Sequence, residues 1–487
     1  MYFRPMAFCG LLKHFLSLTL LLALLASCNS KKEEFGNTDS GSGTSTLGDS
    51  ISANTKVPLL VVRVQFANAT FQSDATTWAN KIFGTSDGQL NHYFSETTYS
   101  NYAFTPVTET DGTANDGIIT VTLSGNHPDT RKNTFSCYAS TAIQATDSYI
   151  NFASYDSDSN SKLSRTEMQV MFLVAGGESA SSINTPGGVW GLFTSMYCDA
   201  DSSGSVSLAH GEGYVELDGV QMMASSTYSM NGYSQFGERQ GSSASDTWDA
   251  TIGIIAHELG HAYFDLPDLY CTSGSCKGIG NFGLMGGGSW GRKSSSEKSG
   301  DTPVHFSAWS KEKTSVCTPQ TAASGTNSYT LSAMYLSSNS SSCGIYKITT
   351  SASDEYFLLE NRSIGGYDQG FYYGLVYASG GTDYAVGTSF TGGLAIWHIK
   401  DIVSSCRSNN NCQTQSPKLA DLEEANDGDL DSGGSSGRKT NLFYSGNSTT
   451  FGDSSTPNSK LSGGTATNIS VSSISAAGDS MTLSITK

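Results

Sequence analysis

The strongest constraint on the fold of this chain is the pentapeptide HELGH at residues 257–261, which lies inside a largely apolar run. His257 and His261 are four positions apart, so on a helix both imidazoles project from one face, where a single zinc ion can bind both. Glu258 follows the first histidine and can act as general base toward a zinc-bound water. The pattern therefore predicts a buried helix and a catalytic metal that serves peptide-bond hydrolysis.

The alternative is a helix whose two histidines are merely packed. The flanking residues argue against it, because apolar side chains recur at helical spacing from Trp248 onward and Thr247 or Asp246 offers an N-cap. We therefore expect a helix over residues 248–264. Two imidazoles and a carboxylate in such a helix would be costly to bury without a partner, which favours the metal.

The third zinc ligand is less constrained by the sequence. Metzincin-type motifs place it six residues after the second histidine, where this chain has Pro267. Asp268 lies one residue further on and is the ligand that we favour. Asp265, expected on the last helical turn, and the more distant Glu297 and His305 are the alternatives.

Two further residues after the helix are candidates for the site. Met285 lies in a glycine-rich stretch, residues 283–288, and resembles the methionine turn that places an apolar sulfur under the zinc of metzincins. An ordinary flexible loop with one core methionine is the alternative. Tyr270 is placed where a side chain could stabilise an oxyanion, as tyrosine or histidine does in many zinc peptidases.

With these residues in view, the chain resembles the M6 peptidases, the group that includes bacterial immune inhibitor A. The resemblance extends to segments 56–62, 284–290, 306–311, 355–362 and 393–398. It implies a zinc-dependent peptidase from about residue 57 to the C-terminus. The distance from the second histidine to the Pro-Asp pair is one residue longer than is usual in the family, and the short polar stretch before residue 56 predicts no long prodomain.

The pattern of apolar residues changes along the chain. Strands are expected at 57–66, 118–123, 168–174 and 215–223, and helices at 78–83, 89–94 and 141–152. This mixture predicts an α/β zincin-like catalytic domain over residues 57–320, with a mixed twisted sheet beside the zinc-site helix. Short strands at 328–331, 344–349, 356–360, 394–399, 469–474 and 480–485 then predict a β-rich, sandwich-like domain over 321–487.

The N-terminus predicts the location of the protein. Residues 11–26 are leucine-rich but short for a membrane span, so residues 1–27 are interpreted as a signal peptide. The residues before Cys28 resemble a bacterial lipobox, which implies a lipid anchor at Cys28 in the cell envelope, facing the periplasm or the exterior. Residues 28–56 then form a flexible linker. A soluble secreted protein is the alternative.

Cysteine content agrees with export. Ten cysteines are present; without Cys9 of the signal peptide and Cys28, eight remain. An even number in an exported chain predicts disulfides, up to four. The easiest local loops join Cys271 to Cys276 and Cys406 to Cys412.

The net charge of -17 opposes binding to nucleic acid and electrostatic docking on anionic lipid. Membrane contact is therefore expected only through the lipid anchor. The expected partners are protein or peptide substrates, and a monomer is expected.

Residues 156–167 match the pattern of a calcium-binding loop, except that Ser161 occupies the position that usually holds glycine. A polar surface turn is the alternative. A second stretch beginning at Asp199 starts in the same way but has His210 in place of the closing acid. The predicted calcium ligands are Asp156, Asp158, Asn160, Lys162 through its carbonyl, Ser164 and Glu167.

Together these observations predict a secreted or envelope zinc endopeptidase that uses Glu258 as general base, with catalytic zinc and structural calcium as cofactors. The rival hypothesis is a surface adhesin or binding lipoprotein on an inactive peptidase scaffold. The intact Glu258 argues against it, because a binding protein has no need of that base.

Overall fold

A long central strand, β1 (Thr55–Gln65), organises the first half of the chain in this computed structural model. β1 pairs in parallel with β4 (Gln169–Glu178) on one side and with β2 (Tyr102–Pro106) and β3 (Ile118–Thr122) on the other. The structure describes residues 55–131, 135–198, 213–222, 232–337, 343–372, 391–407, 410–426 and 428–487.

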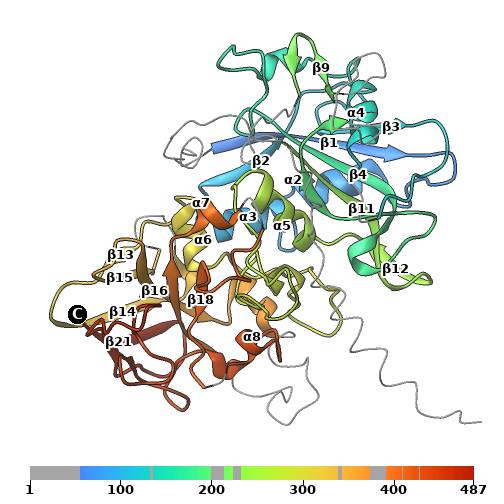
Figure 1. Cartoon of the computed structure of the whole chain (residues 1–487). Coiled ribbons are helices and arrows are strands. Elements are labelled where there is room, and N and C mark those ends of the chain that lie inside the picture. Colours follow the sequence, from blue (N-terminus) through green and yellow to red (C-terminus); the bar gives the residue numbers. More distant parts are fainter. Residues whose placement is uncertain are drawn as a thin grey trace, which may run out of the picture.

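The sheet continues beyond β4 toward the predicted zinc-site helix. β11 (Tyr233–Ser243) pairs in parallel with β4, and β12 (Asp246–Asp249) pairs antiparallel with β11 at the edge. The result is a mixed, curled sheet with helices on both sides (Figure 1). Its short accessory strands are β5 (Gly188–Val189) and β6 (Leu192–Thr194), and the small hairpins beside it are built from β7 (Tyr197–Cys198), β8 (Gly213–Tyr214), β9 (Glu216–Leu217) and β10 (Val220–Gln221).

Alternation along β1 explains how this sheet is covered. Successive side chains of a strand point to opposite faces, so Leu59 and Val61 enter one apolar cluster while Leu60 and Val62 enter another. The first cluster contains residues of α2 (Ala75–Phe83), α3 (Leu90–Thr97) and α5 (Ile252–Ala262). The second contains residues of α4 (Ser136–Gln144).

The second half of the chain is rich in strands. One sheet has the order β13-β15-β16-β17-β18 and the other β14-β21-β20-β19. Apolar residues of both sheets form a shared cluster, which includes Phe357 and Ile396 from the first sheet and Val471 and Leu483 from the second. The strands are β13 (Gln320–Thr321), β14 (Thr326–Ser332), β15 (Tyr346–Thr349), β16 (Glu355–Ser363), β17 (Gly392–Lys400), β18 (Ala420–Leu422), β19 (Phe451–Gly452), β20 (Ser470–Ser472) and β21 (Ser480–Thr486).

The two halves share one apolar core. Leu358 of β16 and Trp397 of β17 belong to the same cluster as Leu259 of α5 and Trp309 of α6 (Ala308–Lys313). Helix α5 consequently lies where the green and orange parts of the chain meet in Figure 1. The short helices α7 (Val403–Cys406) and α8 (Asp429–Ser432) belong to the second half.

Three expectations about local structure need correction. The zinc-site helix begins at Ile252 after the cap residue Thr251, because Trp248 pairs with Gln240 in the edge strand β12. Helix α4 spans Ser136–Gln144 rather than residues 141–152, since the chain turns after Gln144. The strand expected at 215–223 is a hairpin of β9 and β10, because Asp218 and Gly219 both adopt left-handed backbone conformations.

The eight cysteines that follow Cys28 form four disulfides. Two are the predicted local loops, Cys271–Cys276 and Cys406–Cys412. The other two are Cys137–Cys198 and Cys317–Cys343. Within the described ranges, no helix is long and apolar enough to cross a membrane.

Candidate metal centre

The two histidines of the motif face each other across one turn of α5. The Nε2 atoms of His257 and His261 are 3.2 Å apart. Helix geometry places residues four apart on the same face, and the surrounding apolar residues bury that face against the rest of the fold. His257 is only 6% exposed.

Both imidazoles are oriented by backbone carbonyls. Nδ1 of His257 lies 3.0 Å from the carbonyl oxygen of Leu284, and Nδ1 of His261 lies 2.7 Å from that of Leu266. Because a carbonyl oxygen only accepts hydrogen bonds, each Nδ1 carries the proton and donates it. Each Nε2 is thereby left with its lone pair directed toward the other histidine, which is the tautomer that a metal requires.

Asp268 completes the cluster. Its Oδ1 lies 3.2 Å from Nε2 of His257 and 3.1 Å from Nε2 of His261. Three ligand atoms bound to one tetrahedral zinc at about 2.0–2.1 Å would be separated by roughly 3.3 Å, so this triangle fits the ion. Burial raises the pKa of Asp268, but when the adjacent imidazoles are protonated their charge outweighs burial and holds that pKa below its usual range.

The chain reverses between the second histidine and Asp268. Asp265 adopts a left-handed backbone conformation with φ 60°, just after the last helical residue, Ala262. Its carboxylate pairs with Arg407 and, at 3.6 Å, with Arg165. This left-handed turn brings Asp268 back over the helix.

The other sequence alternatives lie elsewhere. His305 is buried, and its Nε2 lies 2.9 Å from Glu96. Glu297 accepts hydrogen bonds from the backbone of Lys293 and the hydroxyl of Thr302. The structure therefore brings Asp268, and neither of these residues, to the two histidines.

Met285 lies directly beneath the histidine-bearing helix. A Cβ atom built on Gly260 would lie 2.4 Å from Sδ of Met285, so the sulfur occupies the space that the missing side chain leaves. The carbonyl of Met285 also accepts a hydrogen bond from the amide of Leu269, next to Asp268. The methionine therefore supports both the helix and the segment that carries the carboxylate.

The two predicted catalytic residues adjoin the cluster in different ways, Glu258 along the helix and Tyr270 through its ring. Glu258 occupies the next position on α5 after His257 and is 1% exposed. The ring of Tyr270 stacks near that of His257, with centroids 6.3 Å apart and an interplanar angle of 25°. Tyr270 is also largely buried.

One residue at the centre was not found from the sequence. Asn410 donates from its side-chain amide to Oδ2 of Asp268 at 2.7 Å, across 142 positions of the chain. The only sequence signal was the spacing of Cys406 and Cys412, which predicts a closed loop but not its location. His398, interpreted as structural from its strand, lies between Glu355 and Glu423 and away from the cluster.

The predicted calcium loop forms a second group of carboxylates. Oxygen atoms of Asp156, Asp158 and Glu167 lie within 4.8 Å of one another. Ser161 has φ 62°, the left-handed conformation that glycine usually supplies at this position. Asp156 accepts hydrogen bonds from the backbone amides of Asn160 and Ser161, which folds the loop around the carboxylates. Calcium binding itself stays a prediction.

Some predictions fall outside the described residues. These include Cys28, the signal peptide and the linker up to residue 54. The second acidic stretch from Asp199 to His210 also lies outside them.

Comparison with known proteins finds one matching family model. The model for the immune inhibitor A peptidase M6 catalytic domain matches residues 221–316, which include both histidines, Asp268 and Met285. No curated protein sequence matches the chain. A similar solved structure is wild-type OgpA from Akkermansia muciniphila, at 11% identity over 64% of this chain and 73% of that chain. Its TM-score of 0.25 is too low to support an inference. The family match, with the His-His-Asp cluster inside it, supports a metallopeptidase related to the M6 family.

Proposed function

We propose that the protein is a zinc-dependent endopeptidase whose metal is held by His257, His261 and Asp268. The observation that supports this most directly is the triangle of two Nε2 atoms and one Oδ1 atom, separated by 3.1–3.2 Å. The fixed tautomers and the family match over the same segment agree with it. Zinc bound in the cluster would supply a Lewis acid that polarises a carbonyl and acidifies water.

Glu258 is the proposed general base. It takes a proton from the water that attacks the peptide carbonyl and later gives that proton to the leaving amine nitrogen. Its place beside His257 on a rigid helix fixes the carboxylate relative to the metal ligands. Burial keeps competing bulk water away from it.

Tyr270 is the proposed stabiliser of the oxyanion. Its ring stacks near His257, so the side chain is held beside the ligand cluster. A hydrogen-bond donor placed where negative charge develops lowers the barrier to peptide hydrolysis. Met285 would have a supporting role under the helix and would not touch the substrate.

The remaining proposals concern stability, location and architecture. Calcium bound by Asp156, Asp158, Glu167 and neighbouring oxygens would stabilise the fold without taking part in hydrolysis. A lipid on Cys28 would anchor the protein to the bacterial envelope. The proposed domains are a zincin-like unit over 57–320 and a sandwich-like unit over 321–487, and the substrates are proteins or peptides.

Cleavage of an unfolded protein such as casein tests this function. The wild type should cleave casein, whereas Glu258→Gln should retain stoichiometric zinc and lose activity by at least about 10²–10⁴-fold, the range expected for a general base. A metal chelator should abolish the wild-type activity. Full proteolysis by Glu258→Gln, or by a zinc-free sample, would refute the mechanism.

A further inference from the structure

The two oxygens of the Asp268 carboxylate contact parts of the chain that lie far apart in the sequence. Its Oδ1 faces the two imidazoles, while its Oδ2 accepts the 2.7 Å hydrogen bond from Asn410. Asp268 is 3% exposed, so water is largely excluded as a substitute for either partner. The orientation of the carboxylate therefore depends on a residue from the second half of the chain.

The loop that carries Asn410 is closed at both ends. The disulfide Cys406–Cys412 spans it, and both cysteines are buried. Asn410 adopts a left-handed backbone conformation with φ 47°, which asparagine tolerates better than most residues. The disulfide lies two residues after Asn410 and restricts the chain on that side of the amide.

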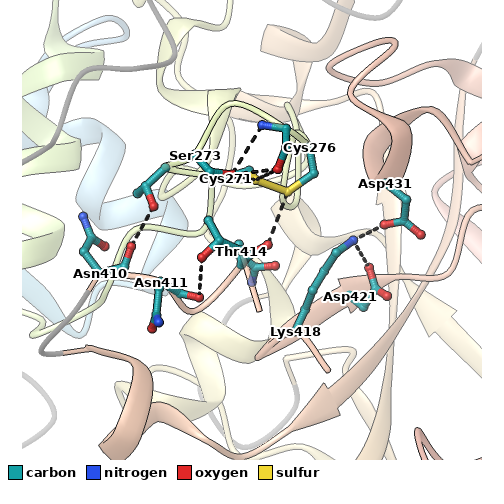
Figure 2. Close-up of a disulfide and its surroundings, with 12 residues drawn as sticks. Cys271, Ser273, Cys276, Asn410, Asn411, Thr414, Lys418, Asp421 and Asp431 are labelled. Carbon is teal, nitrogen blue, oxygen red and sulfur yellow. Dashed lines mark hydrogen bonds and ion pairs between the residues drawn. A yellow bond between two sulfur atoms is a disulfide. The ribbon is translucent and has the colours of Figure 1, made fainter. Parts of the chain in front are cut away.

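A second disulfide-closed loop packs against the first. Cys271, three residues after Asp268, bonds to Cys276. Between them, Thr272 donates a 2.9 Å hydrogen bond to the backbone carbonyl of Asn410. Figure 2 shows Asn410 beside this disulfide. The segment that carries the metal ligand and the loop that orients it are thus joined twice.

The same loop also holds the turn before the ligand. Arg407 pairs with the carboxylate of Asp265, the left-handed residue at which the chain reverses. Arg165, from the first half of the chain, approaches the same carboxylate at 3.6 Å. Both acidic residues of the segment 265–268 are therefore fixed by one loop.

We propose that Asn410 is a positioning residue for the zinc ligand Asp268, and that the Cys406–Cys412 loop makes the second half of the chain part of the metal centre. This inference rests on the proposed zinc-binding function. Residues that hydrogen-bond a metal ligand restrict its orientation and raise metal affinity. Their loss typically lowers metal affinity about 10–100-fold.

Zinc affinity, measured by competition with a chromophoric chelator, tests the role of Asn410 without recourse to activity. In Asn410→Asp the donor amide becomes a carboxylate of nearly the same shape, so the hydrogen bond is replaced by repulsion. We expect zinc to bind about 10–100-fold more weakly. The matched control is Asn411→Asp, which adds the same charge to the same loop, where the backbone carbonyl of residue 411 accepts from Thr414. The control should bind zinc as tightly as the wild type.

A second variant separates positioning from charge and from folding. Asn410→Gly removes the donor, permits the left-handed backbone and adds no charge. It should also weaken zinc binding, and the absorption bands of the cobalt-substituted protein should shift because the ligand geometry changes. Wild-type affinity in Asn410→Gly would overturn the inference while leaving the proposed function intact. A wild-type protein that binds no zinc would overturn both.

Discussion

Gly260 of the motif helix lies so close to Met285 that a single added methyl group would meet the sulfur at 2.4 Å. Gly260 is one residue before His261, and both Gly260 and Met285 are buried. The absence of a side chain at residue 260 therefore allows Met285 to approach the helix that carries His257 and His261.

Gly260→Ala should destabilise the protein and disturb the metal centre. Overpacking a well-packed core costs about 1–3 kcal/mol, so the melting temperature should fall and zinc should bind more weakly. Met285→Ala opens space under the helix, so the double variant should lose less than the sum of the two single losses. If the losses in melting temperature of the two single variants simply add in the double variant, the methyl group at residue 260 and the side chain of Met285 do not compete for this space.

The two aspartates after the helix should respond differently to the same change. Asp268→Asn removes a proposed zinc ligand. Zinc affinity should therefore fall by more than the about 10–100-fold expected when a residue that only hydrogen-bonds a ligand is lost. Asp265→Asn instead leaves Arg407 and Arg165 without their carboxylate and should cost about 3 kcal/mol of stability. Chelator competition and chemical denaturation of both variants measure these effects. If Asp268→Asn retains wild-type affinity, Asp268 is not a ligand.

His398 should make stability depend on pH. Burial lowers the pKa of this histidine, but Glu423 and Glu355 on either side outweigh burial and raise it above 6.5. The contribution to the free energy of unfolding is therefore fully present below pH 6.5, and it is lost as pH rises through the raised value. His398→Gln should lower the melting temperature most at acidic pH and least at alkaline pH.

An effect of His398→Gln on the melting temperature that does not vary with pH would contradict the role of the two glutamates.

Ser161 offers a test of the calcium loop. A non-glycine residue in the left-handed region costs of order 1–3 kcal/mol, so Ser161→Gly should raise calcium affinity and the melting temperature. Glu167→Gln should have the opposite effect, because it removes the closing carboxylate. Chelation with EGTA should lower the wild-type melting temperature. No shift on EGTA treatment, in a sample that retains zinc, would exclude a calcium site.

The sequence predicted the elements that depend on local periodicity. Continuous apolar runs indicated β1 and β4, and short strand-like stretches between polar turns indicated strands such as β16 and β17. Helix ends were less predictable, because Trp248 is apolar at helical spacing yet is held in β12 by pairing with β11. Long-range pairing overrode local preference there.

The sequence by itself determined that His257 and His261 face each other, because residues four apart lie on one face of a helix in any fold. Only the tertiary structure decided which carboxylate meets them. The left-handed turn at Asp265 carries Asp268 back over α5, and packing of the disulfide-closed loop brings Asn410 behind it. Spacing along one helix is a local property of the chain, whereas contacts across 142 residues depend on how the two halves pack together.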